Sequence, residues 1–205
     1  MSEHIRLSLW FGTQPAVQVL PRLVQAAEQL PAEALERGVR RLSVTALEWQ
    51  QAALIEEEFD EGIPLASAIA QMKEFFQPDC ACQVDMTWML WKFDREEWKQ
   101  VPHRLQLASL GPSFGERAGS AQEEGHVTVD FGLDEAFLAE QAPWNVETRR
   151  HLQANILQLL AYCHKTQQKM QPQRRLLWSE DESDWTQKLM RRLAAAGTDH
   201  GETVQ

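Results

Sequence analysis

The sequence has few of the features that mark secreted or membrane proteins. It contains only three cysteines, an odd number, so it does not carry the disulfide framework of a small secreted domain. No apolar run approaches the ~20 residues that a membrane helix needs. The first residues, MSEHIRLSLWFG, lack the basic head and apolar block of a secretory signal. These absences predict a cytoplasmic protein that does not insert into a membrane.

Basic residues are also scarce relative to acidic ones. The chain has 20 Lys and Arg against 30 Asp and Glu, which gives a formal net charge of −10. Nucleic-acid binding depends on clustered Lys and Arg that neutralise phosphates, so this balance argues against a nucleic-acid partner. An acidic surface attracts basic partners, although an acidic net charge can also simply maintain solubility.

Common catalytic and cofactor motifs are missing. The chain contains no Gly-x-Ser-x-Gly elbow and no His-Glu-x-x-His pair. Segment 111–125 is rich in glycine and follows a predicted strand, as phosphate loops do. However, no Gly-Lys-Ser/Thr closes it, and Glu123 and Glu124 would repel phosphate. We therefore expect no cofactor and interpret segment 111–125 as a flexible connection.

Apolar residues alternate with polar ones in several segments, which is the period of a half-buried strand. The longest such segment, CACQVDMTWMLWKF, begins at Cys80. At ~3.3 Å per residue it would span about 46 Å, so we expect a bend, a bulge, or a far end covered on both faces. The predicted strands cover residues 4–11, 39–49, 80–93, 103–110 and 126–132.

Helical spacing of apolar residues predicts the remaining elements. Pro21 and Pro31 interrupt the first helical pattern, which predicts a broken or two-piece helix that stops near Gly38. The last helix should be capped by Ser183 or Asp184. The predicted helices cover residues 16–37, 65–76, 134–140 and 146–169, and a segment after the cap.

This order of elements predicts an α+β fold. We expect a mixed, largely antiparallel five-stranded sheet with helices on one face and a helical C-terminal arm. The sheet domain should occupy residues 1–142. A region that is helical throughout should follow over 143–197, packed on the sheet or extending from it, and a disordered tail over 198–205.

The two cysteines of CACQ raise the question of a metal site. Alternation places Cys80 and Cys82 on the apolar face, where free cysteine behaves as a small buried hydrophobe. A structural zinc site needs four ligands, usually in pairs separated by two to four residues. The nearest other candidates, Cys163 and His164, are adjacent on a predicted helix and point about 100° apart. We therefore expect buried thiols and no metal.

One polar patch contains groups suited to acid–base chemistry. His126, Thr128 and Asp130 share the outer face of a predicted strand, with His126 and Asp130 ~7 Å apart along it if no bulge intervenes. His103 would join them if its strand pairs with theirs. This patch, covered by segment 111–125, would be the site of a small enzyme. The alternative is an ordinary solvated polar face.

The sharpest charge feature is an acidic run. Between Glu48 and Glu61 the chain has six acidic residues and no basic one. Such a run is either a solvated face or a docking patch for a basic partner. The proposed docking residues are Glu56, Glu57, Glu58, Asp60 and Glu61. Six basic residues of the C-terminal half could attract this run within the chain or between two copies: Arg149, Arg150, Lys165, Lys169, Arg174 and Arg175.

Three of the eight tryptophans cluster around a predicted hairpin. Trp88 continues the apolar face of its strand. Trp91 and Trp98 lie on the other face or in the turn, where aromatic side chains are typical of interaction surfaces.

Together these features lead to a functional hypothesis. The chain would be a non-enzymatic, acidic, cytoplasmic protein that binds or regulates a protein partner of basic charge, or that self-associates. It would use its acidic run and exposed tryptophans for this purpose. Two alternatives remain open: a small enzyme acting through His103, His126 and Asp130, and a structural subunit docked by its C-terminal helices.

Overall fold

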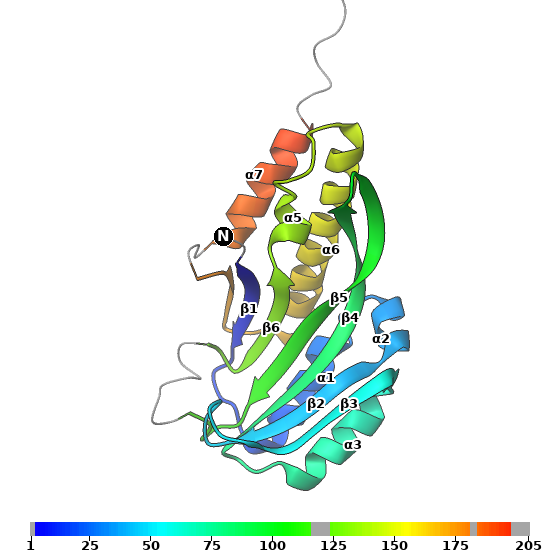
Figure 1. The fold of residues 1–205 in the computed structure, drawn as a ribbon. Helices are drawn as coiled ribbons and strands as arrows, with labels where there is room; N and C mark the ends of the chain where they lie inside the picture. Colours follow the sequence, from blue (N-terminus) through cyan, green and yellow to red (C-terminus); the bar gives the residue numbers. More distant parts are fainter. Residues whose placement is uncertain (1–2, 116–123, 181–183, 198–205) are drawn as a thin grey trace, which may run out of the picture.

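The protein is built around one seven-stranded sheet in which every neighbouring pair of strands is antiparallel. The structure is a computed structural model and describes residues 3–115, 124–180 and 184–197. The strand order is β3-β2-β4-β5-β6-β1-β7 (Figure 1). The strands are β1 (His4–Trp10), β2 (Val39–Ala46), β3 (Ala53–Ile63), β4 (Cys80–Asp94), β5 (Glu97–Leu110), β6 (Val127–Leu133) and β7 (Arg174–Trp178).

Helices cover one face of this sheet. The described helices are α1 (Val19–Ala27), α2 (Ala32–Arg37), α3 (Leu65–Phe75), α5 (Glu135–Leu138), α6 (Val146–Met170) and α7 (Trp185–Gly197), with a 3-10 turn at Ala16–Gln18. In Figure 1, α1 and α6 lie behind β4, β5 and β6, and no described helix crosses in front of these strands. We call this uncovered front the open face. No described helix is both long and apolar enough to cross a membrane.

A single large core fills the space between the sheet and the helices. Alternate residues of the strands point into it, and Leu7, Val84 and Leu107 are fully buried. Helix α6 contributes Leu152 and Ile156 to the same core. Burying one such side chain contributes roughly 1.5–3 kcal/mol, so the core holds the helices on this face. The α+β class is confirmed.

The predicted five-stranded, mixed sheet is wrong in strand number and in its mixed character. Strand β3 was missed because its sequence, ALIEEEFDEGI, does not alternate: it is an edge strand whose glutamates are exposed on both faces. Strand β7 was missed because it is only five residues long and reads RRLLW. For the same reason, the expectation that residues 143–197 are helical throughout is also wrong.

The predicted two-piece helix is confirmed as α1 and α2. Pro31 separates them, whereas Pro21 lies in the first turn of α1, where a missing N–H breaks no helical hydrogen bond. Gly38 ends α2 with φ +72°, and a Cβ there would lie 2.4 Å from the carbonyl oxygen of Ile63. Asp184 caps α7 by accepting a hydrogen bond from the Gln187 N–H at 3.1 Å, while Ser183 lies outside the described residues.

The long strand β4 has different neighbours along its two halves. Its pairing with β5 runs from Ala81 to Asp94 without a shift, but β2 pairs with it only as far as Asp85. Beyond that point, Asn155 of α6 accepts a hydrogen bond from the Trp91 N–H at 2.9 Å and donates one to the Trp91 carbonyl at 2.7 Å. Figure 1 shows the far half of the β4–β5 hairpin curving around α6, which confirms the expected bend.

The C-terminal region completes the sheet and its core. Strand β7 pairs with β1, with Leu177 opposite Leu7. Leu159 of α6 and Leu189 of α7 are buried in the same core as the strands. Residues 143–197 therefore pack on the sheet and supply one of its edges. The predicted tail, 198–205, lies outside the described residues.

Candidate functional site

The three predicted acid–base residues lie on two different faces of the sheet. His103 pairs with Trp88 and belongs to the helix-facing set of β5, and its ring packs edge-on against Phe137 with centroids 6.5 Å apart. His126 and Asp130 have the register of the open face. The structure therefore does not bring the three side chains together.

Each of these residues also has its own separate partner. The Nδ1 atom of His126 accepts a hydrogen bond from the Phe11 N–H at 2.9 Å, and Nε2 of His103 donates to the carbonyl oxygen of Phe131. Burial lowers the pKa of both histidines below its ordinary value, and the Arg22 charge adds to this effect at His126. Within the described part of the chain, neither ring makes a hydrogen bond or ion pair with a carboxylate, and the Asp130 charge raises the pKa of His103 by less than burial lowers it.

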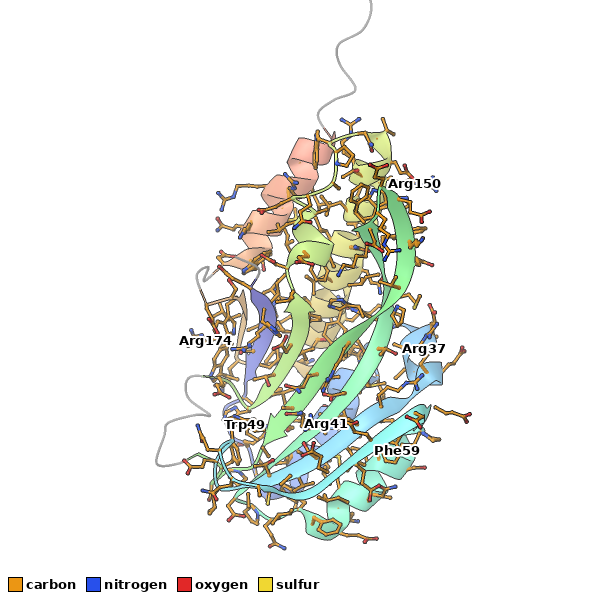
Figure 2. All side chains as sticks on the ribbon, in the orientation of Figure 1. Arg37, Arg41, Trp49, Phe59, Arg150 and Arg174 are labelled. Atoms are coloured by element: carbon orange, nitrogen blue, oxygen red, sulfur yellow. The ribbon has the colours of Figure 1, made fainter. Side chains whose placement is uncertain are left out.

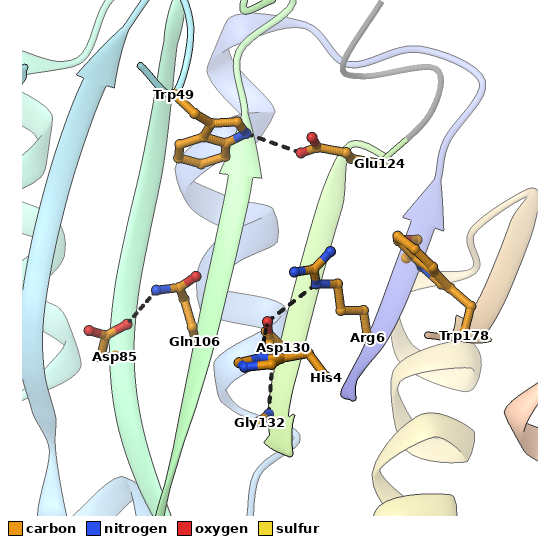
Figure 3. A network of polar contacts seen from close by, with 10 residues as sticks. His4, Arg6, Trp49, Asp85, Gln106, Glu124, Asp130, Gly132 and Trp178 are labelled. Atoms are coloured by element: carbon orange, nitrogen blue, oxygen red, sulfur yellow. Dashed lines mark hydrogen bonds and ion pairs between the residues drawn. The ribbon is translucent and has the colours of Figure 1, made fainter. Parts of the chain in front are cut away.

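Asp130 is held in place by three donors. His4 Nδ1 approaches its carboxylate at 2.9 Å, Arg6 Nε at 3.3 Å and the Gly132 N–H at 2.8 Å (Figure 3). A carboxylate with this many partners is a structural anchor, because its lone pairs are already occupied.

The predicted docking acids lie on the exposed edge strand β3. Glu56 pairs with Arg41 of β2 at 2.6 Å, and Glu58 approaches the same guanidinium at 3.9 Å. Within the described part of the chain, Glu57, Asp60 and Glu61 make no ion pair. Figure 2 marks Arg41 and Phe59 on these neighbouring strands. The acidic residues thus form one continuous exposed strip.

The predicted docking tryptophans are elsewhere and are partly covered. Trp91 and Trp98 both pack against His151 of α6, with ring centroids 3.9 Å and 5.3 Å away. Trp98 Nε1 also donates a hydrogen bond to Thr148 at 3.3 Å. They lie in the far half of the β4–β5 hairpin, beyond the end of the β2 pairing. The acidic strip and these tryptophans are therefore two separate surfaces.

The basic residues that could have met the acidic run lie on α6 and β7. Strand β7 is the opposite edge of the sheet from β3, so these edges cannot meet within one molecule. Arg175 donates to the Cys163 carbonyl at 2.9 Å, and Arg174 lies over the Trp10 ring, 4.5 Å from its centroid.

The three thiols are buried and free. Burial raises the pKa of Cys80 and of Cys82 above its ordinary value, and raises that of Cys163 to about 12. Thiols of this kind stay protonated at neutral pH and are poor nucleophiles and ligands. Among the described residues, no group of three or more His, Cys, Asp and Glu side chains is placed to hold a metal ion.

Side chains of the open face form two rows across the strands. Asp85 is paired in register with Arg41 on one side and Gln106 on the other, and the register continues to β7. We call this the charged row: Arg41, Asp85, Gln106, Asp130, Arg6 and Trp178. One step along the strands, ~7 Å away, lies a second set with small or uncharged side chains. We call it the neutral row: Ser43, Gln83, Ala108, Thr128 and Ser8.

A hollow of about 250 Å³ opens over these two rows. It exists because Ala108 and Thr128 are small, whereas the indoles of Trp49 and Trp178 stand on opposite sides of it (Figure 3). A second hollow of about 290 Å³ adjoins it over β2, and Trp49 and Gln83 line both. Together they make a trough across the open face.

Sequence reasoning missed this trough because it depends on strand order. The odd positions of β4, including Gln83 and Asp85, were visible as polar. No local sequence pattern indicated that Thr128 and Trp178 would lie on the same face of the sheet. Pairing the polar positions of successive strands would have brought Gln83 and Gln106 together.

Comparison with known proteins adds no relative. The chain matches no protein-family model, and no curated protein or solved structure is significantly similar to it.

Proposed function

We propose that this chain is a non-enzymatic cytoplasmic protein that binds a basic protein partner along β3. The observation that carries the proposal is an eleven-residue edge strand with five acidic side chains. No further described strand pairs with β3, so its outer N–H and C=O groups are open to an added strand. An extended segment that pairs with this edge would gain main-chain hydrogen bonds.

The charges on β3 select the partner. Like charges directly opposite one another destabilise a pair of strands, so the glutamates discourage two copies from pairing through β3. A segment with Lys or Arg on both of its faces would instead lie beside Glu57, Asp60 and Glu61, which have no ion-pair partner in the described part of the chain. The free, buried thiols are compatible with a reducing cytoplasm.

The test uses a synthetic peptide of about 10 residues that alternates pairs of lysines with pairs of valines, which places lysines on both faces and is long enough to span a typical strand. Fluorescence anisotropy should detect binding that weakens between about 50 and about 300 mM salt. The triple variant E57K/D60K/E61K should weaken binding at least about tenfold. These three positions leave the Arg41 ion pairs intact.

A matched control distinguishes the effect of the acidic residues on β3 from the effect of the net charge of the protein. The variant E28K/E96K/E180K makes the same change in charge at exposed positions outside β3 and should bind the peptide nearly as well as the native chain. A peptide N-methylated on every residue should not bind, because neither of its edges can donate a hydrogen bond to β3. Equal losses in both triple variants would refute the proposal, since only overall charge would then matter.

A further inference from the structure

The base of the trough on the open face carries polar side chains that are available to bind a ligand. Gln83, Ala108 and Thr128 form the base of the first hollow, and Ser43 and Thr45 continue it into the second. Among the described residues, the side chains of Gln83 and Thr128 make no hydrogen bond within the protein. An amide and a hydroxyl can each donate and accept, so this floor offers hydrogen bonds of both kinds to a ligand.

The walls of the first hollow are two fixed indoles. Trp49 packs edge-on against Phe114 at 4.9 Å, and its Nε1 donates to Glu124 at 3.1 Å. Trp178 donates from Nε1 to the Ser8 hydroxyl at 2.9 Å. Because their N–H groups are engaged, these rings offer the ligand mainly apolar surface.

Both guanidiniums around the trough lie beside carboxylates. Arg6 is held by Asp130, and Arg41 contacts both Glu56 and Asp85. Each guanidinium thus has at least one carboxylate beside it, which weakens its attraction for a phosphate or carboxylate ligand. The lining of the trough also carries more acids than bases, which disfavours an anion further. A neutral ligand needs no charged partner and therefore fits this lining.

We propose that the open-face trough binds a short neutral saccharide. A pyranose ring has an apolar face of C–H groups, which suits an indole wall, and a rim of hydroxyls that both donate and accept. The hydroxyls would bond Gln83, Thr128 and the side-chain oxygen Oε1 of Gln106, which accepts no hydrogen bond from the described residues. Each hollow lies at or below the lower end of the ~300–1,000 Å³ range of ligand pockets, so each suits one small ring. This site is independent of the partner proposed for β3.

The test is a titration with neutral trisaccharides of glucose, mannose and N-acetylglucosamine. The indole N–H signals of Trp49 and Trp178 are followed by NMR and assigned with the W49F and W178F variants. At least one sugar should shift both signals, with a Kd of about 0.1–1 mM, as expected for a small polar ligand in an open site. Glucose 6-phosphate, adenosine and a neutral peptide serve as comparison ligands.

Single substitutions on the floor decide whether the trough is responsible. Gln83→Ala and Thr128→Ala should each weaken binding about five- to tenfold, the loss of one or two hydrogen bonds to an uncharged ligand. Gln153→Ala, an exposed position on α6, should leave it unchanged. Three results would each overturn the proposal: no shift with any sugar at about 10 mM, floor variants that bind like the native chain, or tighter binding of any comparison ligand.

Discussion

Asp85 and Arg104 form an ion pair between β4 and β5 on the open face of the sheet. The side chain of Asp85 is 2% exposed, whereas that of Arg104 is 62% exposed. Arg41 of β2 reaches the same carboxylate at 3.5 Å, and the Gln106 amide donates to it at 3.2 Å. A buried carboxylate is tolerated only when it is paired, so this cluster fixes the register of three neighbouring strands.

Replacing Asp85 should therefore destabilise the fold. Asp85→Ala removes the common partner of two guanidiniums and should lower the free energy of unfolding by about 2–4 kcal/mol. Asp85→Asn should lose less, because its amide keeps part of the hydrogen bonding. Urea denaturation measures both values, with Asp94→Ala at an exposed position of the same strand as the control. A native-like midpoint for Asp85→Ala would show that the cluster is dispensable.

Asn155 should be equally sensitive, because it takes the place of a missing strand beside β4. Asn155→Ala leaves the Trp91 N–H, the Trp91 carbonyl and the Ala136 carbonyl without their partner, and should cost about 3 kcal/mol or more. Asn155→Asp should not rescue the loss, since a carboxylate cannot donate to the two carbonyls. Amide hydrogen exchange at Trp91 should accelerate in both variants. Gln153→Ala, on the exposed side of α6, is the control, and equal exchange in all variants would contradict this role.

The sequence patterns that predicted the fold correctly were those set by burial. Cys82, Val84 and Met86 alternate with polar residues because one face of β4 packs on the core, and this signal is local. Strand β3 carries a weaker signal: Ile55, Phe59 and Ile63 pack against the core, but the consecutive glutamates 56–58 between them interrupt the alternation. Its acidic residues were identified as a surface, but its role as a sheet edge depends on pairing with β2.

The candidate sites were harder to predict, because they depend on residues brought together by the sheet order. The register of β6 places Asp130 on the outer face, whereas His126 precedes this strand, and His103 was grouped with them without knowledge of its register. Its opposite orientation follows from pairing with Trp88 of β4. Trp178 could not be connected to Trp49 at all from sequence, because β7 was not recognised as a strand.

The pH dependence of stability should contain a contribution from His103. Its folded-state pKa is lowered from 6.5 by burial, so between the two pKa values the unfolded chain binds more protons than the folded chain. Stability should therefore fall as the pH drops through about 6.5, and this loss should level off below the folded-state pKa.

The variant His103→Gln isolates this contribution. Its free energy of unfolding should change less between about pH 7.5 and about pH 5.5 than that of the native chain. Since the pKa of His126 is also lowered, His126→Gln should flatten the curve in the same direction, and the double variant should flatten it most. The opposite result, a steeper curve for His103→Gln, would show that protonation of this ring stabilises the fold.

The last prediction tests whether the C-terminal region, residues 143–205, is an integral part of the fold or a detachable arm. A chain that ends at Ala142 lacks α6, β7 and α7, and thereby exposes the core face of the sheet and removes one of the two partners of β1. We expect this fragment to lack cooperative unfolding and to bind hydrophobic dyes. Adding residues 143–205 as a separate peptide should restore a cooperative transition, because the two parts share one core. A fragment 1–142 that is monomeric and unfolds cooperatively on its own would instead identify the C-terminal helices as an appended docking arm.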